Sequence, residues 1–241
     1  MGAGLVNRAA ATKKAAFRRP SKEKTMQPKL IIFDWDGTLA DTTGPIIETV
    51  RQSFYECGLA KPPADRIRNL IGHSLAQMMH LLAPDADAHK HEELVETYAA
   101  LYLHPDNRQM RLFPDALPAL DTLKARGFWL AVATGKGRSG LDLAIAQTRT
   151  ADYWLATATA SEYPSKPAPD MVLEICGELG LMPSESLVVG DTAYDLEMAA
   201  NAGARGVGLT TGAHDAETLR GAPNIGILPR LAELPALIAS L

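Results

Sequence analysis

Cysteine is scarce in this sequence: its 241 residues include two, Cys57 and Cys176, which lie far apart. Two isolated cysteines form neither a disulfide framework nor a metal-binding cluster, and such sparse use is typical of proteins in a reducing cytoplasm. The sequence also lacks any apolar run close to the ~18 residues that a membrane-spanning helix requires. We therefore expect a soluble, cytoplasmic protein that has no membrane as a partner.

Charge is unevenly distributed along the chain. The formal net charge is −4, but residues 1–29 contain eight lysines and arginines against the single acid Glu23, which leaves −11 for the remainder. An acidic body argues against nucleic acid as a partner. We expect residues 1–28 to form a basic, disordered tail. Translation could also begin at Met26, and a transit peptide or a contact with phosphate backbones would fit the same composition.

Hydrophobic spacing divides the rest of the chain into two parts. Residues 30–33 form an apolar, β-branched run that predicts a short buried strand. Residues 43–110 show helical spacing and no strand-like alternation, which predicts an all-helical cap. Further along, helices and strands alternate, which is typical of right-handed crossovers and a parallel sheet. We therefore predict an α/β fold: a doubly wound, Rossmann-like parallel sheet of residues 29–42 and 111–241, interrupted by the cap.

Polar residues follow the predicted strands at the points where the strands end. In such open parallel sheets, ligands bind beyond the carboxyl ends of the strands. Besides residues 30–33, we expect strands at residues 129–133, 153–156, 187–189 and 207–209. The residues expected to converge at this edge are Asp34, Asp36, Gly37, Thr38, Thr134, Gly135, Lys166, Asp191 and Asp195.

Four clustered carboxylates cannot all ionise without a compensating cation. Oxygen ligands of this kind suit Mg²⁺, and the lack of histidine or cysteine among them disfavours zinc. A carboxylate beside Mg²⁺ can attack phosphorus and form an aspartyl-phosphate. Lys166, Thr134 and the backbone amides around Gly37 would then stabilise the transferring oxygens. A second carboxylate would protonate the leaving alcohol and later deprotonate water.

Taken in order, these residues resemble the four motifs of the haloacid dehalogenase superfamily. The motifs are Asp34-Trp35-Asp36-Gly37-Thr38, then Thr134, then Lys166, and finally Gly190-Asp191 with Asp195. The resemblance covers roughly residues 29–241, and the insert after the first motif is similar to that of phosphoglycolate phosphatase-like enzymes with a helical cap.

This resemblance implies roles for individual residues. Asp34 would be the nucleophile and Asp36 the general acid/base, with Thr134 and Lys166 as further catalytic residues. Substrate would be bound by Gly37, Thr38, Thr134, Gly135 and Lys166. The metal, Mg²⁺, would be held by Asp34, the backbone carbonyl of Asp36 and Asp191, with Asp195 either at the metal's edge or ordering Lys166. Two residues depart from the family pattern: Gly135 stands where asparagine is frequent, so a contact to substrate or cap would be missing, and Asp115 replaces a frequent glycine.

The implied function is that of a Mg²⁺-dependent phosphatase acting on a small phosphorylated metabolite, either 2-phosphoglycolate-like or a sugar phosphate. We expect a monomer or homodimer. The alternatives are a phosphomutase of the β-phosphoglucomutase type and a non-enzymatic phospho-acceptor switch. Lys136 is expected to be a solvated loop cation, with direct catalysis as the alternative. His73 is expected to face solvent, with a substrate contact as the alternative.

Overall fold

The computed structural model describes residues 27–104 and 110–241. The predicted tail therefore lies almost entirely outside the described residues, as does the end of the predicted cap. The described strands form one parallel sheet in the order β3-β2-β1-β4-β5-β6. Their bounds are β1 Leu30–Phe33, β2 Trp129–Thr134, β3 Ala156–Thr159, β4 Ser186–Gly190, β5 Arg205–Leu209 and β6 Gly226–Leu228.

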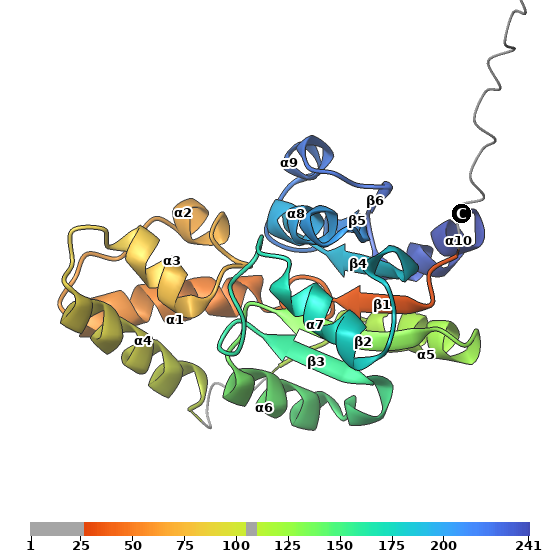
Figure 1. Cartoon of the computed structure of the whole chain (residues 1–241). Helices are drawn as coiled ribbons and strands as arrows, with labels where there is room; N and C mark the ends of the chain where they lie inside the picture. Colours follow the sequence, from red (N-terminus) through yellow and green to blue (C-terminus); the bar gives the residue numbers. More distant parts are fainter. Residues whose placement is uncertain (1–26, 105–109) are drawn as a thin grey trace, which may run out of the picture.

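Helices cover both faces of this sheet (Figure 1). Because successive side chains of a strand point to opposite faces, Ile31 and Phe33 of β1 face one helical layer while Leu30 and Ile32 face the other. The first layer contains α5 Ala116–Ala125, α6 Arg138–Thr148 and α10 Leu234–Ala239. The second contains α7 Asp170–Glu178 and α8 Ala193–Ala202. This arrangement confirms the predicted doubly wound α/β fold.

Four helices lie between β1 and α5 in the chain and form a separate group beyond the carboxyl end of β1 (Figure 1). They are α1 Thr43–Glu56, α2 Ala64–Arg68, α3 Leu75–Leu82 and α4 Ala88–Tyr102. Their apolar faces pack on one another around Val50, Met79 and Leu94, all fully buried. Ser74 caps α3 by accepting a hydrogen bond from the Gln77 amide. We call this group the cap and the rest of the fold the core.

The structure places some elements differently from the sequence pattern. The predicted strand at residues 153–156 is shifted, because Ala151–Tyr153 form a 3₁₀ turn and β3 begins only at Ala156. The aromatic ring of Trp154 instead packs edge-on against Phe33 and Trp35 beneath the sheet. The sequence pattern does not predict the short strand β6 or the helix α9 Ala216–Gly221. No helix in the described part of the chain is long and apolar enough to cross a membrane.

Candidate active site

The predicted carboxylates converge where the central strands end. In the sheet Phe33 of β1 is paired with Val132 of β2 and Val189 of β4, so the residues that follow these strands meet at one edge. The amide of Asp34 extends the ladder by donating to the Val189 carbonyl at 2.9 Å. Asp191 follows β4, and Asp195 lies in the first turn of α8. All three of these carboxylates are buried.

Asp34, Asp191 and Asp195 form a compact acidic triad, with one oxygen of each within 4.8 Å of the others. Burial raises the pKa of Asp34 to about 6, the charge of Asp195 adds to the rise, and Lys166 opposes it. Burial also raises the pKa of Asp191 well above its ordinary value, and the neighbouring Asp34 and Asp195 raise it further. Lys166 therefore compensates the negative charge of the triad only in part. The donors are carboxylate oxygens, which Mg²⁺ prefers, so the triad fits the expected metal.

Lys166 is in direct contact with this triad, and it is fully buried. Its Nζ lies 2.7 Å from Oδ1 of Asp34 and 2.6 Å from Oδ1 of Asp195. Burial alone would lower the pKa of Lys166, but the two carboxylates outweigh that effect and raise it. The ammonium group is therefore held in its charged form against the predicted nucleophile.

Asp195 has hydrogen-bond partners on both of its oxygens. Oδ1 accepts from Lys166 at 2.6 Å, and Oδ2 accepts from the hydroxyl and the amide of Thr192 at 2.7 and 3.1 Å. The contacts to Thr192 also form the N-terminal capping box of α8. Of the two roles that the resemblance left open for Asp195, this geometry favours ordering of Lys166.

Asp191 is held by two hydrogen bonds, and the backbone of Gly37 packs closely against it. Its Oδ1 accepts from the Thr38 hydroxyl at 2.8 Å, and its Oδ2 accepts from the Ala213 amide at 2.7 Å. Gly37 has φ of +79°, and a Cβ there would lie 2.7 Å from Cγ of Asp191 and 2.9 Å from Cα of Gly212. The side chain of Thr38 thus positions a carboxylate. The amide of Gly37 donates to the Ala40 carbonyl at 2.8 Å and is used within its own turn.

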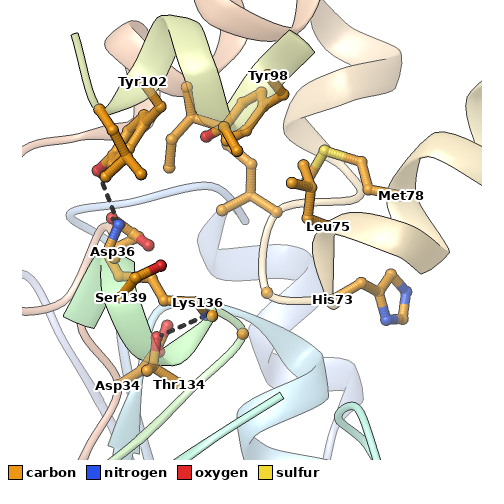
Figure 2. A pocket seen from close by; sticks show the side chains of 18 residues that line it. Asp34, Asp36, His73, Leu75, Met78, Tyr98, Tyr102, Thr134, Lys136 and Ser139 are labelled. Atoms are coloured by element: carbon orange, nitrogen blue, oxygen red, sulfur yellow. Dashed lines mark hydrogen bonds and ion pairs between the residues drawn. The ribbon is translucent and has the colours of Figure 1, made fainter. Parts of the chain in front are cut away.

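Asp36 stands apart from the acidic triad and faces the cap. Its Oδ1 accepts from the Thr42 hydroxyl at 2.6 Å and forms an ion pair with Nζ of Lys136 at 2.9 Å. The same Nζ donates to the hydroxyl of Tyr102, on α4, at 2.8 Å and lies 4.7 Å from the centre of that ring (Figure 2). Burial lowers the pKa of Lys136, but Asp36 and Tyr102 raise it above its ordinary value. The expectation of a solvated loop cation at Lys136 is therefore wrong.

Thr134 ends β2, and its hydroxyl accepts a hydrogen bond from the Lys136 amide at 3.3 Å. It lines a cavity of about 150 Å³ between core and cap, together with Asp34, Asp36 and Gly135. Gly135 lies directly under the cap: a Cβ there would lie 2.6 Å from the His73 carbonyl oxygen and 2.7 Å from that of Gly72. The frequent asparagine of the family has no space here, because the loop before α3 occupies its position.

His73 is buried, so the expectation that it faces solvent is also wrong. Its Nδ1 lies 3.1 Å from the backbone carbonyl of Lys166, and its ring packs at a tilt of 35° against that of Tyr194, with centres 4.0 Å apart. The Tyr194 hydroxyl donates to the Asn69 carbonyl at 2.9 Å. Burial lowers the pKa of His73, and these contacts hold the ring between cap and core.

Sequence reasoning missed the aromatic residues of α4 as part of the site. The spacing of Tyr98 and Tyr102 indicates only a helix, yet both line the cavity, and their rings stack with centres 5.5 Å apart. Their separation by four residues places them on one helix face. Nothing in that spacing tells which face meets the core, so the pattern alone could not assign them.

A buried lysine among carboxylates at the ends of parallel strands, beneath a helical cap, defines a class of capped α/β enzymes. The chain belongs to the haloacid dehalogenase-like hydrolase family, whose model matches residues 31–209. The predicted family and the predicted hydrolase class are thereby confirmed.

Individual relatives support the same assignment. A phosphoglycolate phosphatase of Mannheimia succiniciproducens is 30% identical over 195 residues, which are 77% of this chain and 87% of the relative. A Clostridium perfringens protein named as a pyrophosphatase, PpaX, is 30% identical over 183 residues, 75% of this chain and 83% of the relative. The crystal structure of a hydrolase from Pseudomonas syringae superposes with a TM-score of 0.80 at 24% identity, covering 88% of this chain and 99% of that one. This last likeness concerns the fold.

Proposed function

We propose that this protein is a Mg²⁺-dependent phosphatase that hydrolyses a small phosphomonoester through an aspartyl-phosphate on Asp34. The observation that carries the proposal is the buried Asp34 carboxylate, which is paired with Lys166 at 2.7 Å and lines a cavity between core and cap. The enzyme is thus a phosphoric monoester hydrolase. The relative named phosphoglycolate phosphatase makes 2-phosphoglycolate the reference compound, and sugar phosphates come next.

Three groups of this chain would hold the metal: the carboxylates of Asp34 and Asp191, and the backbone carbonyl of Asp36. When bound, Mg²⁺ would neutralise charge on the carboxylates and on the substrate phosphoryl group. Asp195 lies within the same triad, but its two oxygens already accept hydrogen bonds from Lys166 and Thr192. Its proposed part is therefore to orient Lys166 toward the nucleophile.

The chemical steps follow from the positions of two aspartates. Ionised Asp34 attacks phosphorus, the bond from phosphorus to the ester oxygen breaks, and Asp36 gives its proton to the leaving alcohol. Asp36 then takes a proton from water, whose oxygen attacks the phosphorus and releases phosphate and free Asp34. Thr42 and Lys136 fix the Asp36 side chain on the cap side of the nucleophile, where the leaving group would lie.

Lys166 and Thr134 complete the phosphoryl site. The charged Lys166 ammonium lies against the attacking oxygen, where it would stabilise negative charge on the transferring group. The Thr134 hydroxyl faces the same cavity and can donate to a phosphoryl oxygen. The cap covers both residues and would limit water to the molecule needed in the second step.

The remaining predictions concern partners and location. We propose a small phosphorylated metabolite as the partner, neither nucleic acid nor a membrane, and a monomer or homodimer in the cytoplasm. The two cysteines are free and buried, which suits a reducing compartment.

The test is Mg²⁺-dependent release of phosphate from 2-phosphoglycolate and a panel of phosphomonoesters. Asp34→Asn keeps the shape of the side chain but removes the nucleophile, so kcat should fall by at least about 10⁴-fold. Circular dichroism spectra of the variant and the wild type should match. A folded Asp34→Asn variant that keeps most of its activity would contradict the proposed mechanism, as would activity unchanged by chelation of Mg²⁺.

A further inference from the structure

The cap side of the cavity is apolar. It is lined by Ile46 of α1, Ile71 before α3, Leu75 and Met78 of α3, and Ala99 and Leu103 at the end of α4. Figure 2 shows Leu75, Met78 and Tyr98 on the cap side of the cavity and Asp34 and Thr134 on the core side. A phosphoryl group held at Asp34 would therefore point its ester substituent toward hydrocarbon side chains.

The two nitrogen-bearing side chains at this wall, Lys136 and His73, already have partners. Among the described residues that line the cavity, Lys136 is the one lysine or arginine, and its Nζ is shared between Asp36 at 2.9 Å and Tyr102 at 2.8 Å. The ring of His73 is held by the Lys166 carbonyl and by Tyr194. A carboxylate on the leaving group would therefore find no uncommitted lysine or arginine among the described residues of the lining, and its burial without a cation is strongly unfavourable.

We infer that the leaving group of the substrate is a small, uncharged and predominantly apolar alcohol. This inference rests on the proposed phosphatase function and narrows its substrate class. The hydroxyl groups of a sugar would mostly face Ile46, Leu75 and Met78, where they would lose hydrogen bonds to water without replacement. The whole cavity, which must also take the phosphoryl group beside Asp34 and Thr134, has a volume of about 150 Å³, roughly that of a benzene-binding cavity, so the substituent is short.

The sharpest test compares two esters of nearly equal size. Isobutyl phosphate and 2-phosphoglycolate have the same number of heavy atoms beyond the ester oxygen, but one ends in two methyl groups and the other in a carboxylate. With Mg²⁺ present, kcat/KM for isobutyl phosphate should exceed that for 2-phosphoglycolate by about 10-fold to 100-fold, the discrimination typical of an apolar pocket. An equal or reversed ranking would overturn the inference.

A substitution in the wall should change this ranking. Leu75 is half-buried at the cavity, so Leu75→Lys can place an ammonium group beside the substituent. We expect kcat/KM to fall about 10-fold for isobutyl phosphate and to rise for 2-phosphoglycolate, because the pocket then offers a charge partner. The matched control is Leu81→Lys on the same helix, where the side chain is 39% exposed and lies away from the cavity. It should leave both values unchanged. A Leu75→Lys variant that folds and keeps the wild-type ranking would count against the apolar wall as the determinant.

Acetyl phosphate separates this inference from the proposed function. Its leaving group, acetate, is small and departs readily without contacts to the cap. Its Asp34-dependent hydrolysis therefore reports on the catalytic residues of the core alone. Hydrolysis of acetyl phosphate together with preference for 2-phosphoglycolate or glucose 6-phosphate over isobutyl phosphate would overturn the apolar substrate class and leave the phosphatase standing. If the enzyme hydrolyses neither acetyl phosphate nor any of the three esters, both the inference and the proposed function are overturned.

Discussion

The core and the cap meet at one cavity but contribute different chemistry to it. On the core side, three charged groups are each fixed by two contacts: Lys166 by two aspartates, Asp195 by Lys166 and Thr192, and Asp191 by Thr38 and Ala213. On the cap side the wall consists mainly of hydrocarbon and aromatic side chains held by packing. The core is thus built for one geometry, whereas the cap can change its lining without disturbing that geometry.

This contrast predicts that substitutions in the core abolish the reaction and that substitutions in the cap change its rate or its substrate. A substitution at Gly135, where the core contacts the cap loop at residues 72–73, should reduce activity by an intermediate amount.

After the nucleophile Asp34 itself, Lys166 should give the largest effect when it is replaced. Lys166→Met leaves the buried carboxylates of Asp34 and Asp195 without their shared cation, which should lower the free energy of unfolding by about 3–5 kcal/mol and reduce kcat by at least about 10³-fold. Urea denaturation and phosphate release measure the two quantities. The matched control is Lys29→Met, which removes an exposed ion pair to Glu185 and should cost less than about 1 kcal/mol. Equal losses of stability for the two variants would show that the buried ion pairs of Lys166 stabilise the protein no more than an exposed pair does.

A side chain at Gly135 should affect the contact between the two parts. Gly135→Ala directs a methyl group at the carbonyl oxygens of Gly72 and His73, so the cap loop must move away from the core. We expect kcat/KM to fall about 10-fold to 100-fold, because small misplacement of groups around a reacting centre has effects of this size. The melting temperature should change little. Gly177→Ala is the control, since its Cβ would meet nothing within 4 Å, and it should retain full activity. Wild-type activity in Gly135→Ala would show that the cap need not sit this close.

The smallest effect is expected in the cap. Tyr102→Phe removes the hydroxyl that accepts from Lys136 but keeps the aromatic wall and the pair of Lys136 with Asp36. We expect kcat to fall by about 3-fold to 10-fold, equivalent to the net value of about one hydrogen bond, with KM for apolar esters nearly unchanged. Steady-state kinetics distinguish this outcome from a rise in KM alone, which would assign Tyr102 to substrate binding instead.

The sequence predicted the core of the site well, because its signals are local. A short apolar run followed by Asp34 and Asp36, and another followed by Asp191, place carboxylates at strand ends, and the parallel sheet then brings those ends together. Residues whose environment depends on the cap are harder to predict. Lys136 and His73 look solvated in the sequence because their partners, Tyr102 and Tyr194, are distant in the chain and come into contact only once the cap packs on the core.

Other differences have equally physical causes. Tyr153 and Trp154 have the composition of a strand, but Trp154 packs beneath the sheet against Phe33 and Trp35, so the chain turns before β3 begins. Strand β6 has three residues and two neighbouring prolines at 223 and 229, too short a pattern to separate from a loop. Specificity could not be predicted for a related reason. The spacing of Ile46, Leu75 and Met78 is that of ordinary amphipathic helices. Only the packed structure shows that these side chains also line the cavity.

The close approach of residue 135 to the loop at 72–73 has a consequence for exchanging caps among family members. In a relative with asparagine at the equivalent position, the cap loop must leave room for that side chain. Grafted onto this core, it would leave a gap above Gly135, whereas this cap on an asparagine-bearing core would be held open by its own carbonyl oxygens. The residue at position 135 must therefore match the cap, although it lies in the core. A chimaera that exchanges caps should therefore also exchange residue 135, so that it comes from the same protein as the cap.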